Sequence, residues 1–350
     1  MKAAVNHGLM DVRVDNVPDP RIEKPTDAIC RVTKCSICGT DLHIYHGRFP
    51  LKEGDCVGHE FIGYVEEVGS EVKSFKKGDK VLSPFWISCG QCYFCKKGLT
   101  TSCLYGGCFG FGDILGGNPG CQAEYVRVPL ADGTLVKVPE SLADDSNDER
   151  VLFIGDNIAT GYHGAVKGEI RPGDVVAVLG DGAVGLFATY CATLFNPSKV
   201  FTIGHHDDRL KIAKKYGADI TINSLKEDPS EKIKAETDGR GADVIIEGVG
   251  TTDSLQSSIQ LVRAGGTVSF IGLFYEPFPM NMTDFFLRNL NLRGGVAPSR
   301  GYASKLLSIV EAKKLDPTHI VYSLPLDQAA EGYKLMDQRK EGAIKVVLSP

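Results

Sequence analysis

The sequence predicts an α/β protein in which a doubly wound parallel sheet follows a β-rich segment. From about residue 156 onward, short apolar runs alternate with helical patterns of about 10–15 residues, which is typical of parallel sheets. The preceding residues instead carry short β-like runs separated by glycine- and proline-containing turns. A chain of 350 residues also exceeds the size of most single cores, so two domains are expected.

The β-rich segment, residues 1 to about 155, contains three clear strand patterns. They are AICRV (28–32), EFIGYVEEVG (60–69) and AEYVRVP (123–129). Residues 103–121 are so rich in glycine that no regular element is expected there. This segment is therefore predicted to be a β-rich domain with irregular excursions.

The second segment repeats strand and helix in turn. Predicted strands are 174–180, 199–204, 220–223, 242–250 and 266–272. Helices are predicted over 183–195 and 207–218, and two amphipathic helices over 302–315 and 326–340. The alternation predicts a parallel sheet with helices packed on it.

Composition and charge exclude several classes of protein. The chain is 43% apolar and 24% charged, as in ordinary globular proteins. A net charge of −5 argues against a nucleic-acid-binding surface. No stretch approaches the roughly 20 apolar residues of a membrane span. The N-terminus becomes polar too soon for a secretory signal, so a cytoplasmic location with reduced thiols is expected.

Four of the 11 cysteines form a C-x2-C-x2-C-x7-C pattern: Cys89, Cys92, Cys95 and Cys103. Short C-x2-C steps let successive sulfurs turn toward one ion, and four thiolates complete the tetrahedral coordination of Zn²⁺. Such a site has no open position for substrate, so its role is structural and the chemistry is expected elsewhere. The alternatives are a [4Fe–4S] cluster and an exposed turn with idle thiols.

The hexapeptide GDGAVG, which begins at Gly180, follows an apolar strand pattern and opens a helical one. In that context the pattern G-x-G-x-x-G predicts a dinucleotide-binding turn. Gly180 makes the tight turn, Gly182 lets the backbone approach a pyrophosphate, and Gly185 allows helix and strand to pack closely. Ala183 and Val184 begin the helix whose N–H groups face the phosphates. The alternative is a glycine turn that binds no ligand.

The end of the next strand favours NADP over NAD. An Asp or Glu there would bind the ribose 2′-OH of NAD, but the sequence has Gly204. Glycine leaves room for a 2′-phosphate, and His205, His206 and Arg209 are groups that can bind one. The alternative is that both histidines merely face solvent, and the two aspartates between His206 and Arg209 oppose phosphate binding.

Two more residues in the β-rich segment are of types that bind metals. Cys38 lies in CGTDLH and His59 in GHE, on separate segments. A lone Cys and a lone His are more often structural. Cys35 and Cys38 also form a C-x-x-C pair, so a redox dithiol is a competing interpretation.

These motifs occur in one chain and in one order: CGTDLH, GHEFIGYVEEVG, the four-cysteine loop, TGYHGAVK and GDGAVG. Together they resemble the zinc-dependent medium-chain alcohol dehydrogenase family over essentially the whole chain. The resemblance implies a GroES-like catalytic domain made of residues 1–155 and 297–350. It also implies a Rossmann domain, residues 156–296, inserted between the two parts.

By this resemblance, Cys38 and His59 match two ligands of a catalytic zinc. The third position, a Cys in many members, is Asp156 here, as in the Cys–His–Asp subgroup that includes bacterial secondary-alcohol dehydrogenases. A thiolate, a carboxylate and a neutral imidazole sum to −2, which balances Zn²⁺ and leaves one position open. Glu60 matches a glutamate that sits beside the metal or transiently on it. Orienting the ligands by hydrogen bonds is its alternative role.

The resemblance assigns further roles. Thr40 matches the hydroxyl that passes on the substrate proton, and His43 matches the histidine that hands it to solvent. Lys345 resembles a basic residue that contacts the cofactor phosphates, although a solvated lysine is the alternative. Phe85 matches an aromatic of the substrate pocket, with Trp86 beside it, and both would equally suit a plain core.

The expected protein is a zinc-dependent, NADP-preferring enzyme that interconverts a small, neutral alcohol, with secondary alcohols favoured, and its ketone or aldehyde. Two zinc ions per chain are expected, one catalytic and one structural. The alternatives are a polyol or formaldehyde-type dehydrogenase that uses NAD, and a zinc-free, quinone reductase-like protein that binds NADPH. The resemblance further implies a homotetramer, with a dimer second, and no nucleic-acid or membrane partner.

Overall fold

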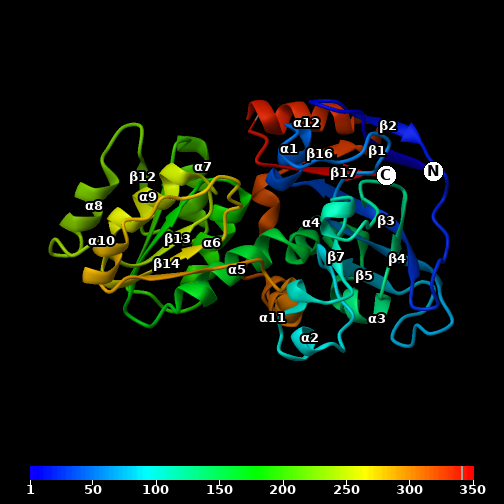
Figure 1. Ribbon diagram of the computed structural model, residues 1–350, viewed down its shortest axis with the longest axis horizontal. Helices are drawn as coiled ribbons and strands as arrows, with labels where there is room; N and C mark the ends of the chain where they lie inside the picture. Colours follow the sequence, from blue (N-terminus) through cyan, green and yellow to red (C-terminus); the bar gives the residue numbers. More distant parts are fainter. Residues whose placement is uncertain (340–341) are drawn as a thin grey trace. The chain divides into compact units, whose positions relative to one another are not determined.

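The computed structural model describes residues 1–339 and 342–350 and divides the chain into two compact units (Figure 1). Unit 1 comprises Met1–Ala159 and Pro298–Pro350, and unit 2 comprises Thr160–Ala297. The sequence placed the first boundary after residue 155. The structure instead groups residues 156–159 with unit 1, so Asp156 belongs to the same unit as Cys38.

Unit 1 is built on a mostly antiparallel sheet with strand order β16-β17-β3-β4-β5-β9, in which β8 also pairs with β3. Two-stranded sheets β1-β2 and β6-β7 complete it. The bounds are β1 (Lys2–Asn6), β2 (Val12–Asn16), β3 (Ala28–Ile37), β4 (Phe61–Val68), β5 (Lys80–Ser83), β6 (Trp86–Ile87), β7 (Gly107–Cys108), β8 (Tyr125–Val128), β9 (Val136–Lys137), β16 (Val321–Pro325) and β17 (Lys345–Ser349).

The C-terminal strand β17 joins the tail of the chain to this sheet. It pairs antiparallel with β3, where Val346 lies opposite Ile37, and parallel with β16. Four of its five residues are buried, which explains why so short a terminal segment is held firmly. The buried end of β3 then leads directly to Cys38.

The helices of unit 1 are mostly short. They are α1 (Gly39–Tyr45), α2 (Tyr93–Lys96), α3 (Ala131–Thr134), α4 (Asp148–Val151), α11 (Ser299–Glu311) and α12 (Ala329–Gln338). Helix α5 (Asn157–Gly168) begins in unit 1 and continues in unit 2. The predicted helix over 326–340 appears as a 3₁₀ turn followed by α12, and residue 340 lies outside the described residues.

Unit 2 contains a six-stranded parallel sheet with the order β12-β11-β10-β13-β14-β15, which is the doubly wound order expected for a dinucleotide-binding fold. Its strands are β10 (Val175–Leu179), β11 (Lys199–Gly204), β12 (Ile220–Asn223), β13 (Ala242–Glu247), β14 (Val262–Phe270) and β15 (Asn291–Gly294). Every residue of the central strand β10 is buried, as a strand covered on both faces requires.

Five helices belong to unit 2: α6 (Ala183–Thr193), α7 (Asp207–Lys215), α8 (Pro229–Ala235), α9 (Thr252–Leu261) and α10 (Met282–Leu287). Helices α6, α7 and α9 pack on the sheet. All strands predicted from residue 174 onward are present, with ends that differ by a few residues. The sheet places the loop after β10 beside the end of β11, because these two strands are direct neighbours.

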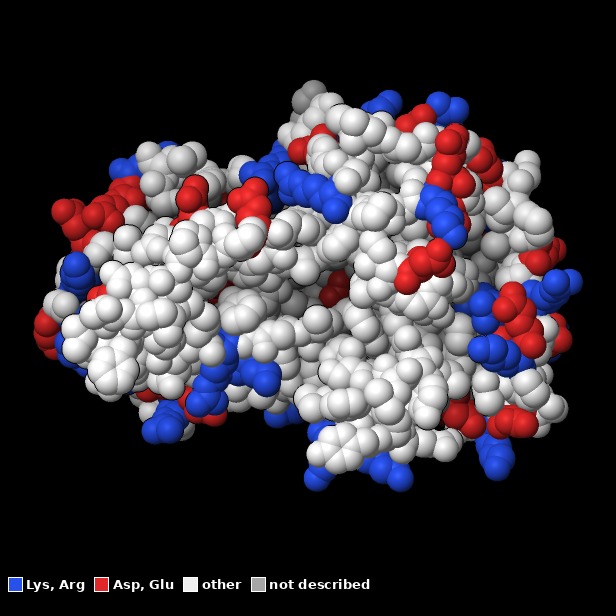
Figure 2. All heavy atoms as spheres, in the orientation of Figure 1, with Lys and Arg blue, Asp and Glu red and all other residues white. Residues whose placement is uncertain are grey.

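Two observations bear on possible binding partners: the distribution of surface charge, and the length and apolarity of the helices. Basic and acidic side chains are interspersed on the face drawn in Figure 2. Among the described residues, no helix is both long and apolar enough to cross a membrane.

Candidate metal and cofactor sites

The four-cysteine loop brings all its sulfurs together. The four Sγ atoms lie within 4.8 Å of one another, and all four thiols are free of disulfides. Cys89 Sγ is 3.9 Å from Cys95 Sγ, and Cys92 Sγ is 4.0 Å from Cys103 Sγ. Four sulfurs at about 2.3 Å from one zinc ion stand roughly 3.8 Å apart, so these thiols fit a tetrahedral zinc.

Backbone N–H groups in this loop point at the sulfurs. The N–H of Cys89 donates to Cys103 Sγ at 3.2 Å, and the N–H of Cys92 donates to Cys89 Sγ at 3.3 Å. Backbone N–H groups of Cys95 and Leu104 lower the pKa of the Cys92 thiol to about 6. These donors favour the thiolate of Cys92, the form that binds a metal, whereas burial raises the pKa values of the Cys95 and Cys103 thiols.

A second cluster combines different donors. Cys38, His59, Glu60 and Asp156 are all buried, and one donor atom of each lies within 4.8 Å of the others. Asp156 Oδ2 is 3.4 Å from both Cys38 Sγ and His59 Nε2. The cluster draws on three separate segments: the end of β3, the entry to β4 and the entry to α5. It has one thiol where the loop has four, and it contains a residue, Glu60, with further partners of its own.

Asp41 organises two of these donors from outside the cluster. Its Oδ1 is 2.9 Å from His59 Nδ1, and its Oδ2 accepts the N–H of Cys38 at 2.8 Å. Gln122 Nε2 donates to the same Oδ2 at 3.1 Å. Asp41 therefore turns His59 Nε2 toward the other donors, as carboxylates behind metal-binding histidines do.

Glu60 is fixed by a buried cation. Its Oε1 is 2.6 Å from Lys345 Nζ, and its Oε2 accepts a hydrogen bond from Ser36 Oγ at 2.6 Å. Asn157 Nδ2 also lies 3.3 Å from Oε1. Lys345 is only 1% exposed, and although burial would lower its pKa, the neighbouring thiol and carboxylates raise it. The structure thus buries Lys345 beside Glu60, which contradicts the alternative of a solvated lysine, while the predicted contact with the cofactor phosphates stays a prediction.

The predicted proton-relay residues share one helix. Thr40 Oγ1 lies 3.6 Å from Cys38 Sγ, and His43 follows one turn later on α1. Burial, followed by the positive charge of Arg48, lowers the pKa of His43 to about 4. The imidazole is therefore neutral at physiological pH and able to accept a proton.

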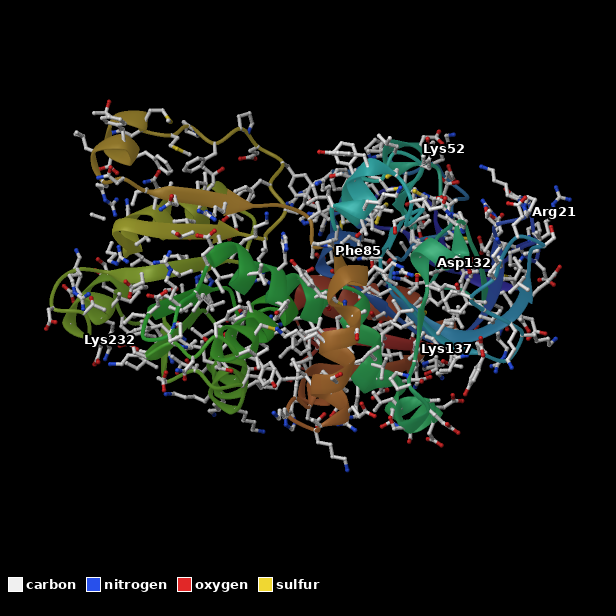
Figure 3. All side chains as sticks on the ribbon, turned by 90° about the horizontal axis from the view of Figure 1, so that it is seen from below. Arg21, Lys52, Phe85, Asp132, Lys137 and Lys232 are labelled. Atoms are coloured by element: carbon white, nitrogen blue, oxygen red, sulfur yellow. The ribbon has the colours of Figure 1, made fainter. Side chains whose placement is uncertain are left out.

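Phe85 stands next to the second cluster. Its ring centroid is 6.3 Å from that of His59 in an edge-to-face arrangement, and the ring of Phe111 lies 5.7 Å from the same histidine. Figure 3 shows Phe85 within unit 1, whereas Lys52 extends outward. Trp86 contacts Phe85 edge to face at 6.2 Å. Aromatic rings therefore make one side of the cluster apolar.

The glycine-rich turn of unit 2 has the close packing expected from its sequence. A Cβ at Gly185 would lie 2.1 Å from the carbonyl oxygen of Gly180, so only glycine fits. Gly182 is the N-cap of α6, and a Cβ there would meet nothing within 4 Å. Ala183 and Val184 form the first turn of α6. The free N–H groups of this turn and the open space beside Gly182 fit a pyrophosphate.

The residues predicted to bind a 2′-phosphate lie at the end of β11. Gly204 is its last residue, His205 is exposed, and His206 is the N-cap of α7. Arg209 is buried in the first turn of α7, with 8% of its surface exposed. The three basic groups are therefore not equally accessible to a cofactor.

Sequence reasoning missed Asp41, Asn157 and Asp181. Asp41 lies inside the CGTDLH motif, where its position one turn after Cys38 was an available signal. Asn157 follows Asp156 in the sequence, but its contact with Glu60 forms only when distant segments of the chain come together in the fold. Asp181, between two glycines of the turn, contacts residues that are adjacent only because β10 and β11 pair.

Comparisons with known proteins match the chain along its length. The model for the alcohol dehydrogenase GroES-like domain matches residues 24–140, and that for zinc-binding dehydrogenase matches residues 183–312. The chain is 38% identical to the uncharacterized zinc-type alcohol dehydrogenase-like protein AdhB of Bacillus subtilis, with 100% of each covered. The structure of alcohol dehydrogenase TADH from Thermus sp. ATN1 is 39% identical, with a TM-score of 0.95 and 100% of each chain covered. A protein of Sinorhizobium meliloti bound to NADP, described as a zinc-binding dehydrogenase, is 28% identical with a TM-score of 0.86, covering 100% of this chain and 99% of that one.

Proposed function

Because the chain belongs to the zinc-dependent medium-chain alcohol dehydrogenase family, whose members are oxidoreductases, we propose that it interconverts small, neutral alcohols and their carbonyl compounds, with secondary alcohols and ketones favoured over primary alcohols and aldehydes. The buried cluster of Cys38, His59, Glu60 and Asp156 carries this proposal. It offers the mixed sulfur, nitrogen and oxygen donors of a catalytic zinc, whereas the four-cysteine loop offers a closed set.

In this proposal Cys38, His59 and Asp156 hold the catalytic zinc. Their charges of −1, 0 and −1 balance a divalent ion and leave one position for the substrate oxygen. Glu60 stays beside the metal, because Lys345 and Ser36 already bind its two carboxylate oxygens. When bound, Zn²⁺ polarises the substrate oxygen and lowers the pKa of an alcohol, and the dinucleotide takes or gives the hydride.

The chain's own residues move the proton and exclude water. Thr40 Oγ1, which lies next to Cys38 Sγ, hydrogen-bonds the reacting oxygen and passes its proton on. His43 receives that proton, since its imidazole is neutral above a pKa of about 4. Phe85 and Phe111 flank His59 and keep the site apolar, which strengthens the electrostatic effect of the charged donors.

The preference between NAD and NADP depends on the residues at the end of β11. The sequence predicted NADP, and the NADP-bound relative from Sinorhizobium meliloti supports that prediction. In this chain, however, the imidazole of His206 is already hydrogen-bonded to the carboxylate of Asp181. The preference for NADP stays a prediction, and the position of Asp181 weighs against it.

The four-cysteine loop would hold the second zinc, with a structural role. Assembly as a homotetramer, or secondarily as a dimer, and a cytoplasmic location also stay predictions. None of these alters the expected chemistry of the buried cluster.

The proposal is tested by zinc analysis together with an activity screen. Purified protein should contain two zinc ions per chain and should oxidise small secondary alcohols with NAD or NADP. Faster turnover of polyols or of formaldehyde adducts would replace the proposed substrate class by one of its alternatives. One zinc per chain together with reduction of quinones would contradict the alcohol dehydrogenase assignment.

A further inference from the structure

A carboxylate lies inside the glycine-rich turn of unit 2. Asp181 stands between Gly180 and Gly182, in the loop that connects β10 to α6. Its Oδ2 accepts the backbone N–H of His205 at 2.7 Å and that of His206 at 2.8 Å. The same oxygen is 2.9 Å from His206 Nδ1. Asp181 therefore connects the phosphate-binding turn to the end of β11.

The carboxylate fills the space that a side chain at Gly204 would need. A Cβ at Gly204 would lie 2.5 Å from Asp181 Oδ2 and 2.7 Å from its Cγ. In dinucleotide-binding sheets, an Asp or Glu at the end of this strand accepts hydrogen bonds from the adenosine ribose. The acidic group that is absent from position 204 is thus supplied from the neighbouring turn.

The carboxylate of Asp181 is held in its charged form, and its hydrogen bonds use only one of its two oxygens. Burial alone would raise its pKa, but the hydrogen bonds from His206 and from two backbone N–H groups lower it. All three interactions use Oδ2. Within residues 1–339 and 342–350, no group is placed to donate a hydrogen bond to Oδ1. That oxygen can accept one from a ribose hydroxyl.

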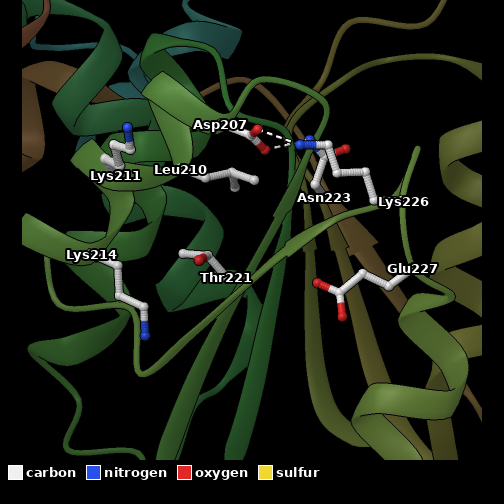
Figure 4. Close-up of a pocket in the computed structure, with 8 residues that line it drawn as sticks. All are labelled: Asp207, Leu210, Lys211, Lys214, Thr221, Asn223, Lys226 and Glu227. Carbon is white, nitrogen blue, oxygen red and sulfur yellow. Dashed lines mark hydrogen bonds and ion pairs between the residues drawn. The ribbon is translucent and has the colours of Figure 1, made fainter.

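The basic groups nearby are largely engaged. His206 faces Asp181, and Arg209 is buried. Lys226 and Asn223 both bind Asp207, and all three residues line the pocket drawn in Figure 4. Of the predicted phosphate-binding residues, only His205 is exposed. One imidazole is a weak match for a dianionic phosphate placed beside a fixed carboxylate.

We propose that Asp181 sets the nucleotide preference by accepting a hydrogen bond from the adenosine ribose, and that the enzyme therefore prefers NAD to NADP. This inference rests on the use of a nicotinamide dinucleotide but not on the identity of the alcohol. It differs from the usual arrangement because the selecting carboxylate comes from the glycine-rich turn and not from the strand that follows it.

The substitution Asp181→Asn tests the proposal with little change of shape. An amide keeps one oxygen for the N–H groups of His205 and His206, but it puts an NH₂ group where Oδ1 was. Dissociation constants for 5′-AMP, 2′,5′-ADP, NADH and NADPH would be measured by calorimetry or fluorescence without alcohol. Wild type should favour the forms without the 2′-phosphate, and Asp181→Asn should shift the ratio toward the phosphorylated forms by about tenfold or more. Asp208→Asn, which removes an exposed carboxylate nearby, should shift it much less.

Moving the carboxylate gives a second test. Gly204→Asp alone would collide with Asp181 and should weaken both nucleotides. The double variant Asp181→Gly/Gly204→Asp returns the acid to the strand end and should recover the preference for NADH. Comparing Gly204→Asp with the double variant tests the role of the carboxylate even if Asp181→Asn folds poorly.

Two results would overturn the inference. One is wild-type protein that binds NADPH and 2′,5′-ADP more tightly than their unphosphorylated counterparts. The other is a ratio for Asp181→Asn no different from that of Asp208→Asn. If the protein shows the expected nucleotide-binding preference but oxidises no alcohol, the proposed function is contradicted, whereas this inference about the nucleotide is not.

Discussion

The two clusters of candidate metal donors in unit 1 are built in opposite ways. The cysteine loop takes all its donors from residues 89–103, and three of its four thiols are partly exposed. The buried cluster takes its donors from positions as far apart as Cys38 and Asp156, and all of them are buried. The loop closes on identical ligands, whereas the buried cluster mixes three kinds of donor and depends on a surrounding layer of polar groups.

The difference indicates what the proposed catalytic zinc site would require beyond its ligands. In the loop, backbone N–H groups of Cys89 and Cys92 donate to the sulfurs. In the buried cluster, orientation depends on Asp41, and Lys345 compensates the charge of Glu60. Burying several charges without such partners would cost several kcal/mol each. If the proposed roles hold, the catalytic site depends on the surrounding fold, whereas the structural site takes its donors from one loop.

The largest expected effect comes from removing a buried ligand. Asp156→Ala should lower kcat/KM by about 10³-fold, because the loss of metal charge stabilisation amounts to several kcal/mol in the transition state. Zinc analysis should find one ion per chain in place of two. Asp156→Cys is the matched control, since a thiolate also binds zinc and should retain both ions. Unchanged turnover in Asp156→Ala would refute the ligand assignment.

The next effect tests whether the surrounding layer matters only for the buried cluster. Asp41→Asn keeps the shape of the side chain, but an NH₂ group replaces one carboxylate oxygen, so either His59 Nδ1 or the Cys38 N–H loses its acceptor. Activity or affinity for the catalytic zinc should fall about 10–100-fold. The zinc of the cysteine loop should remain, as metal analysis after mild chelation would reveal. Loss of both ions at the same chelator concentration would contradict this distinction.

Sequence reasoning anticipated the two clusters unequally. The spacing of Cys89, Cys92, Cys95 and Cys103 alone predicted a metal site, because its donors are local. Cys38 and His59 looked like isolated residues, and only resemblance to a family linked them to Asp156. Composition and periodicity likewise predicted the parallel sheet, since its strands follow one another in sequence.

The rest depends on contacts that the sequence does not encode locally. Lys345 reaches Glu60 because β17 pairs with β3, so a residue near the C-terminus lies among donors from the first half of the chain. Asp181 meets Gly204 because β10 and β11 are neighbours. Position 204, considered alone, predicted room for a phosphate, although the neighbouring turn fills it with a carboxylate.

A smaller effect on chemistry, but a clear one on stability, is expected from the loop. Cys95→Ser removes one ligand of the closed set and should lower Tm by roughly 10 °C, as expected when a structural metal is lost. The rate of hydride transfer per folded, zinc-loaded catalytic site should change little. Scanning calorimetry and single-turnover kinetics would measure the two quantities. Selective loss of hydride transfer at unchanged Tm would reverse the roles assigned to the clusters.

The smallest effect provides a control that touches neither set of donors. His163 lies on α5 with 4% of its surface exposed, and burial, followed by the charge of Lys167, lowers its pKa to about 4. In the unfolded chain a histidine titrates near pH 6.5. Between these values the unfolded state binds a proton that the folded state does not, so stability should fall as pH drops from about 6.5 to about 4. His163→Gln should lessen this loss, measured as the change in urea midpoint between pH 7 and pH 5, with both zinc ions retained. If His163→Gln also lost zinc at pH 7, the metal loss in Asp156→Ala and Cys95→Ser would reflect general destabilisation. Those variants would then give no evidence that the two clusters differ in role.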